Sequence, residues 1–308
     1  MFKKIVFATT ASPICDEAAK VAFDLAQKYS SKIKVLHVYA LPSHGFSSDV
    51  KSIESGEDVA ATPEYEAELS QELCTIYEEP MKKVEACDVD VRLGEPHREI
   101  LREVRDYESD LVVMGAHTRV DETGALRYRN TIGNTMQKVA KRSKAPVLIV
   151  SRPCTTCFWY FENIIFGTDL SRTSDAAFAF ALKTAKETGA RLYLFHALDI
   201  DKEGVLPENQ PSVEERIEAA KDEMEARYLP MAEGFDNIVM DVWEGTPYVE
   251  ILKYGRERKA DLIVMSHHGN TKASLADPNE EANMGSTIEQ VVLRSACPVA
   301  SVNYGDRL

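Results

Sequence analysis

The chain has 308 residues, of which 44% are hydrophobic and 28% are charged, values close to the averages of globular proteins. Its 50 acidic residues outnumber its 36 basic ones, and the formal net charge of -14 argues against general binding to a nucleic-acid backbone. No apolar stretch approaches the roughly 18 residues that a membrane-spanning helix requires. We therefore expect neither a nucleic-acid partner nor a membrane partner.

The first segment, residues 1–12, has two lysines followed by a short apolar run. The run is shorter than the apolar core of a secretory signal peptide, so we interpret it as the first β-strand of a cytoplasmic protein. The 6 cysteines are scattered along the chain, a pattern that does not resemble a disulfide framework and fits a reducing compartment.

Apolar strands and helical segments alternate along the first half of the chain. The strands expected there are residues 4–8, 34–39, 88–93, 110–114 and 145–150. Between them the sequence predicts helices over residues 13–30, over a long segment from Leu69 to Val84, after Pro96 and from about residue 133. The later strands are apolar without alternation, which is typical of a parallel sheet covered on both faces. Residues 41–62 and 199–211 are expected to be surface loops.

The second half repeats the first. Five blocks recur in the same order: residues 4–12 as 163–171, 35–39 as 194–198, 94–96 as 245–247, 110–114 as 261–265, and 143–147 as 295–299. Because chance similarity would not preserve this order, we infer a tandem duplication. We expect two α/β domains, residues 1–152 and 160–308, each with a doubly wound, parallel five-stranded sheet of the Rossmann-like kind.

Polar and glycine residues follow the strands at the positions where open α/β sheets bind ligands. Gly115 and Ser266 follow the fourth strand of each copy, and a later helix is expected to start near Gly133 and Gly285. Backbone N–H groups at a helix start bind anions. The same Gly-Asn-Thr and Gly-Ser-Thr sequences are also good helix N-caps, so these residues alone leave both interpretations open.

The order of the motifs resembles the universal stress protein family over both halves of the chain. The motifs are a strand ending in Thr-Asp at 168–169, Leu-His at 36–37, Gly-x-Pro at 94–96 and 245–247, Asp-Leu-Ile-Val-Met at 261–265, Gly-Ser at 285–286 and Cys-Pro-Val at 297–299. The resemblance implies a stress-response regulatory binding protein, with ATP or AMP, and Mg with it, as the ligand. It implies no enzyme, although weak ATPase activity stays open.

The resemblance assigns nucleotide binding mainly to the second copy. In the family an Asp that ends the first strand contacts the ribose, backbone groups after the second strand hold the base, and a glycine motif binds the phosphates. The residues implied are Gly167, Thr168, Asp169, Ala197, Met265, Ser266, Gly269, Gly285, Ser286 and Thr287.

Both copies depart from the family motif, and they do so unequally. The first copy has Thr10 in place of the Asp and Thr118 in place of the second glycine, whereas the second copy has Ser266 in place of the first glycine. Both phosphate loops are also longer than in the family. Two alternatives stay open: an enzyme of the same superfamily that hydrolyses a nucleotide or transfers a nucleotidyl group, and a docking scaffold that binds no ligand.

Two groups of residues allow a metal hypothesis. His117, His196, His267 and His268 lie near strand ends, but four such side chains rarely converge, so we favour a polar loop and a strand histidine satisfied within the fold. Cys154 and Cys157 form a single C-x-x-C in the segment that joins the copies; it lacks the further ligands of a zinc site, so we interpret it as packing. With no catalytic triad, paired carboxylates or Walker motif apparent, we assign no catalytic and no metal-binding residue.

The resemblance also bears on assembly. Members of the family commonly dimerise through their last strands. It therefore implies that residues 146–150 and 298–302 pair within one chain, and it leaves a homodimer of tandem chains open. The sequence names no protein partner.

Overall fold

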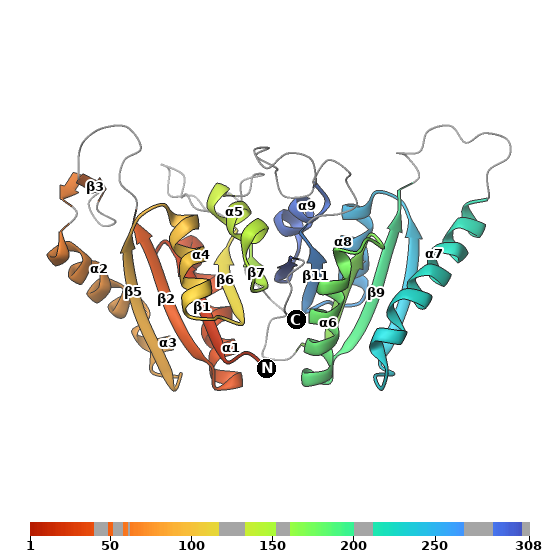
Figure 1. Ribbon diagram of the computed structural model, residues 1–308, viewed down its shortest axis with the longest axis horizontal. Coiled ribbons are helices and arrows are strands. Elements are labelled where there is room, and N and C mark those ends of the chain that lie inside the picture. Colours follow the sequence, from red (N-terminus) through yellow and green to blue (C-terminus); the bar gives the residue numbers. More distant parts are fainter. Residues whose placement is uncertain are drawn as a thin grey trace. The chain divides into compact units, whose positions relative to one another are not determined.

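The computed structural model describes residues 1–39, 49–51, 58–60, 62–116, 133–151, 161–199, 212–267 and 286–303. The chain divides into two compact units, Met1–Val150 and Ser151–Leu308, which we call the first and second domains. Each domain has five parallel strands of its own, its own helices and its own apolar core (Figure 1).

The first domain contains a parallel sheet with the strand order β5-β2-β1-β6-β7. The strands are β1 (Lys4–Thr9), β2 (Lys32–Tyr39), β5 (Ala86–Leu93), β6 (Leu111–Gly115) and β7 (Val147–Val150). The helices are η1 (Pro13–Cys15), α1 (Asp16–Tyr29), α2 (Pro63–Ile76), α3 (Glu78–Met81), α4 (Pro96–Asp106) and α5 (Asn134–Arg142). Helix α1 packs beside α3, and α4 packs beside α5.

The second domain has the equivalent strand order, β10-β9-β8-β11-β12, again with parallel pairing. Its strands are β8 (Asn163–Thr168), β9 (Arg191–Leu198), β10 (Ile238–Glu244), β11 (Leu262–Ser266) and β12 (Val299–Val302). Its helices are α6 (Ser174–Thr188), α7 (Val213–Tyr228), η3 (Pro230–Ala232), α8 (Pro247–Glu257) and α9 (Ser286–Arg294). The predicted doubly wound, Rossmann-like fold is confirmed in both copies.

Local sequence explains where these elements begin and end. Strand β6 is buried at all of its positions, as expected for a strand with helices on both faces. Helix α1 is followed by the cap residue Ser30, which has a φ of 49°, and the equivalent helix α6 is followed by Gly189, which has a φ of 74°. Both are left-handed caps, which close a helix by turning the chain away from its axis. Helix α7 starts with a capping box between Ser212 and Glu215.

The helix predicted to run from Leu69 to Val84 is broken in the structure. Helix α2 stops at Ile76, Tyr77 has a φ of -103° and a ψ of 15°, and the short α3 ends before Val84. Pro80 explains the break, because its ring lacks an N–H group and would clash with the carbonyl of Ile76 in a continuous helix. The segment 41–62, expected to be a loop, contains a short antiparallel pair, β3 (Asp49–Lys51) and β4 (Asp58–Ala60).

The strand order reverses between β1 and β6 in the first domain and between β8 and β11 in the second. Ligands of open α/β sheets bind outside the carboxyl ends of the strands at such a reversal. The fold therefore directs attention to the residues that follow β1 and β8.

Candidate functional site

Strand β8 ends at a buried hydroxyl that organises the following turn. The Thr168 Oγ1 atom lies 2.7 Å from the Tyr228 hydroxyl and accepts a hydrogen bond from Leu170 N at 2.9 Å. Leu170 has a φ of 60°, a left-handed conformation that few residues other than glycine adopt. Burial raises the pKa of Tyr228 to about 12, so its hydroxyl stays protonated at neutral pH. This network fixes the start of the turn that carries the next residue.

Asp169 is the exposed carboxylate at this turn, and two groups hold it in place. Its Oδ1 atom accepts hydrogen bonds from Ser171 N at 3.1 Å and from Ser174 Oγ at 2.8 Å. The Ser174 side chain is buried, and its Oγ lies 3.3 Å from Ser266 Oγ at the end of β11. The turn and two neighbouring strand ends therefore present a fixed negative charge at the reversal of strand order.

The strand residues that the sequence assigned to the site lie beside this carboxylate in the sheet. Gly167 pairs with Met265 across β8 and β11, and Ala197 lies in β9 next to His196. A Cβ atom on Gly167 would lie 2.3 Å from Cδ1 of Ile251 in α8, so a larger residue here would require the end of the Ile251 side chain to move. The first domain has Ala8 at the equivalent position.

The predicted phosphate-binding residues are described only in part. Ser286 and Thr287 form the first turn of α9, where Ser286 is exposed and Thr287 is half-buried. Gly269 and Gly285 lie outside the described residues, as do His117, Thr118, His268, Cys154 and Cys157.

Two of the described histidines, His196 and His267, lie within hydrogen-bonding distance of other groups of the second domain. The Nδ1–H group of His196 donates a hydrogen bond to the Thr168 carbonyl at 2.8 Å, as the strand-histidine interpretation predicts. His267 is buried, with Nδ1 lying 3.4 Å from Ser301 Oγ. Within the described ranges, no group of three or more His, Cys, Asp or Glu side chains is arranged to hold a metal ion.

The first domain reproduces the turn but lacks the carboxylate. Thr9 Oγ1 lies 2.7 Å from the Tyr77 hydroxyl and accepts from Ala11 N at 3.0 Å. Ala11 has a φ of 56°, close to that of its counterpart Leu170. Thr10 lies between Thr9 and Ala11, at the position equivalent to Asp169, and its Oγ1 lies 3.3 Å from the sulfur of the buried Cys15. The first domain thus offers a hydroxyl where the second offers a charge.

Sequence reasoning missed Ser174 and the two tyrosines. Ser174 lies 5 residues beyond the Asp169 carboxylate that it holds, and Tyr228 lies 60 residues beyond Thr168. A signal did exist, because Tyr77 and Tyr228 have the same offset as the later repeat blocks. A tyrosine at the equivalent position of both copies, at or near the end of a helix of otherwise different sequence, indicates a shared structural role.

The fold and the turn after the first strand of each copy define a tandem α/β protein of the doubly wound class. The model of the universal stress protein family matches residues 1–151 and 161–303. The chain therefore belongs to the universal stress protein family.

A relative of known sequence agrees with this assignment, and solved structures match the fold. Universal stress protein MJ0531 of Methanocaldococcus jannaschii is 30% identical over 145 residues, covering 46% of this chain and 82% of the relative. A universal stress protein of Archaeoglobus fulgidus has a solved structure that matches with a TM-score of 0.66 and 21% identity, over 99% of this chain and 97% of its own. The structure of PA1789, a functionally unknown protein of Pseudomonas aeruginosa, matches with a TM-score of 0.62 and 15% identity, over 98% and 92% of the two chains. At these identities, the two structures support the fold alone.

Among the described helices, none is both long enough and apolar enough to cross a membrane.

Proposed function

We propose that this protein is a stress-response regulatory protein whose second domain binds an adenine nucleotide. The observation that carries the proposal is the Asp169 carboxylate, exposed at the strand-order reversal and held by Ser171 N and Ser174 Oγ. A fixed carboxylate accepts hydrogen bonds from the paired hydroxyls of a ribose without reorganising, and such charge-assisted hydrogen bonds are among the strong ones.

The position proposed for the ribose also indicates where the base and the phosphates would bind. Backbone groups of Gly167, Ala197 and Met265 lie at or next to the ends of three adjacent strands, where a flat base can be held against the sheet. Helix α9 starts at Ser286, and free N–H groups at a helix start favour phosphate oxygens. On the family resemblance, Gly269 and Gly285 complete the phosphate loop, and Mg accompanies ATP.

Under this proposal the first domain has no nucleotide site of equal affinity, because Thr10 stands where the second domain has the Asp169 carboxylate. A neutral hydroxyl makes a weaker hydrogen bond to ribose than a carboxylate does. We therefore propose one nucleotide per chain, bound in the second domain, with binding rather than turnover as the function.

Two experiments on the purified full chain test this proposal. The first identifies any co-purified nucleotide by mass spectrometry and then titrates ATP, AMP and GTP, with and without Mg. Saturable binding of an adenine nucleotide is the expected result, and binding of none of the three would contradict the proposal. The second incubates the protein with ATP and measures ADP formation. Turnover would favour the enzyme alternative.

A further inference from the structure

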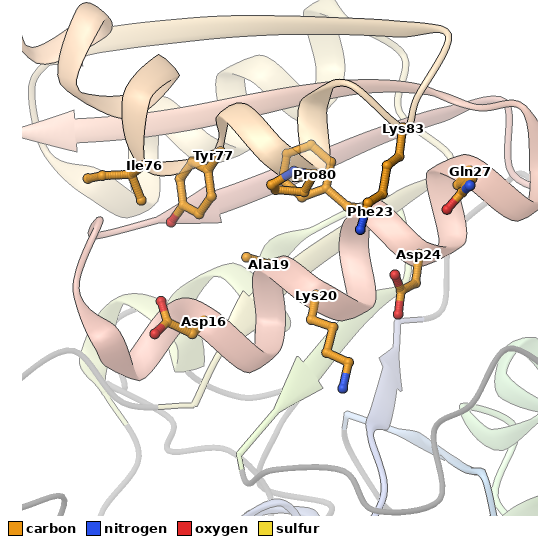
Figure 2. Close-up of a pocket in the computed structure, with 10 residues that line it drawn as sticks. All are labelled: Asp16, Ala19, Lys20, Phe23, Asp24, Gln27, Ile76, Tyr77, Pro80 and Lys83. Atoms are coloured by element: carbon orange, nitrogen blue, oxygen red, sulfur yellow. The ribbon is translucent and has the colours of Figure 1, made fainter.

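A groove of about 240 Å³ lies on the helical surface of the first domain, between α1 and the α2–α3 pair. Figure 2 shows its lining, with α1 on one side and the end of α2 and α3 on the other. Three of its apolar residues, Ala19, Phe23 and Tyr77, are buried, whereas Ile76 is 43% exposed. The groove is separate from the strand ends that carry the nucleotide proposal.

The second domain shows why this groove is open. The residue equivalent to Ala19 is Phe178, whose ring lies 4.6 Å from the Tyr228 ring. In the first domain the aromatic residue is Phe23, one helical turn further along α1, with its ring 6.0 Å from Tyr77. The first domain therefore has its aromatic side chain at Phe23, one turn beyond Ala19. The space over Ala19, which the ring of Phe178 fills in the second domain, is left open as part of the groove.

This end of the groove also lacks a cation that the second domain supplies. Arg227 donates two hydrogen bonds to the Asp175 carboxylate, at 2.7 and 2.9 Å, and its guanidinium lies 5.9 Å from the Tyr228 ring centre. The equivalents of Asp175 and Tyr228 are Asp16 and Tyr77, both retained. Ile76 replaces the arginine. Within the described part of the chain, the Asp16 carboxylate has no ion-pair partner.

The charges around the groove favour the binding of a cation beside Asp16. Asp16 is exposed at the rim, and partial desolvation and then the neighbouring Glu17 raise its pKa, because both disfavour its negative charge. Burial raises the pKa of Asp24, and the positive charges of Lys20 and Lys83 oppose that shift only in part. Asp24 thus has nearby positive charge, whereas the Asp16 end has an excess of negative charge.

We propose that this groove binds an arginine of a partner protein that lies next to an aromatic residue. The guanidinium pairs with Asp16 as Arg227 pairs with Asp175, and the aromatic ring fills the space over Ala19 that Phe178 fills in the second domain. Bidentate pairing and a cation lying over an aromatic face both favour arginine over lysine. The exposed Ile76 adds apolar surface at the rim for the rest of the segment.

The test uses the full chain labelled with ¹⁵N and two dipeptide probes, acetyl-Arg-Phe-amide and acetyl-Phe-Arg-amide. We expect at least one probe to shift the amide signals of Ala19 and Tyr77 in a saturable way. Replacing arginine with its neutral isostere citrulline should weaken binding at least tenfold, and free arginine, which lacks the ring, should be weaker by a similar factor. Absence of saturable shifts at millimolar peptide, or equal binding of the citrulline probe or free arginine, would overturn the proposal.

Variants of the groove provide a second test. Asp16→Asn removes an exposed charge and should weaken binding at least tenfold while leaving the circular dichroism spectrum unchanged. Ala19→Phe with Ile76→Arg copies the second domain into the first and should abolish binding by filling the groove from within. Asp175→Asn is the matched control and should bind as the unaltered chain does. Full binding by Asp16→Asn would overturn the proposal even if the double variant failed to fold.

Discussion

The carboxylate of Asp169 accepts a hydrogen bond from Ser174 Oγ at 2.8 Å, and the equivalent pair in the first domain is Thr10 with Cys15, whose Oγ1 and Sγ atoms lie 3.3 Å apart. Both pairs connect the end of the first strand to the first helical segment after it. The turn is therefore retained in both domains, while its chemistry has diverged from a charged acceptor to a neutral hydroxyl.

The buried tyrosine of each domain should contribute similarly to stability. Tyr228→Phe leaves the Thr168 hydroxyl without one partner, and Tyr77→Phe does the same to Thr9. We expect each change to lower the free energy of unfolding by about 1 kcal/mol, the usual net value of such a hydrogen bond. Urea unfolding of the full chain measures the loss.

Tyr65→Phe is the matched control, because the buried Tyr65 hydroxyl has no hydrogen-bond partner among the residues that the structure describes. This change should leave stability unaltered or slightly higher. A loss at Tyr65 equal to that at Tyr228 would show that the hydrogen bonds to threonine are not the cause.

A second pair of equivalent residues fastens the start of each domain. Asp261 Oδ2 accepts from Glu162 N and Asn163 N, both at 2.9 Å, and Asp110 makes the equivalent bonds to the backbone of Lys3 and Lys4. Asp261→Ala leaves two N–H groups without their charged acceptor. Hydrogen bonds to charged groups contribute about 1.5–3 kcal/mol, so we expect a loss within that range.

The same urea experiment measures the effect of Asp261→Ala. Asp236→Ala provides a control, since Asp236 is an exposed carboxylate in the connection before β10. A loss below about 0.5 kcal/mol for Asp261→Ala, the usual range of a neutral surface change, would contradict the assigned role.

His37 should make the stability of the first domain depend on pH. Burial lowers its pKa below the ordinary value of 6.5, and its Nδ1–H group donates to the Thr9 carbonyl at 3.0 Å. The unfolded state therefore binds the proton more readily, and the stability that the neutral side chain contributes is lost as the pH falls below about 6.5.

Unfolding at about pH 7.5 and about pH 5 measures this dependence, with the ordinary histidine pKa lying between them. His37→Gln cannot take up a proton, so its stability should fall less between the two values. An equal fall in the variant and the unaltered chain would exclude His37 as the source. An NMR titration of the imidazole should also give a pKa below 6.5.

Much of the fold followed from local sequence patterns. Apolar strands without alternation predicted a sheet covered on both faces, and the repeated blocks predicted two copies of it. The break after Ile76 was missed because the spacing of apolar residues continues past Pro80, although that proline cannot join a continuous helix. Local periodicity reports which face a helix buries, and it does not report whether the helix is continuous.

The site was less predictable than the fold. Asp169 could be assigned because the resemblance places an acidic residue at the end of the first strand, but the position of its supporting Ser174 depends on the geometry of the turn. The groove over Ala19 also has no local signal, because it arises from the position of an aromatic residue one turn away. Only the comparison with Phe178 reveals it.

The central claim is that the second domain binds one adenine nucleotide through Asp169. Titration calorimetry with ATP and AMP on the full chain tests this claim most directly, using Asp169→Ala and the equivalent first-domain change Thr10→Ala as the matched control. The account predicts one site per chain, weakened roughly ten- to a hundredfold by Asp169→Ala, in line with the loss of a charge-assisted hydrogen bond of about 1.5–3 kcal/mol, and unchanged by Thr10→Ala. Two equal sites, or one site that Thr10→Ala weakens and Asp169→Ala leaves intact, would contradict it.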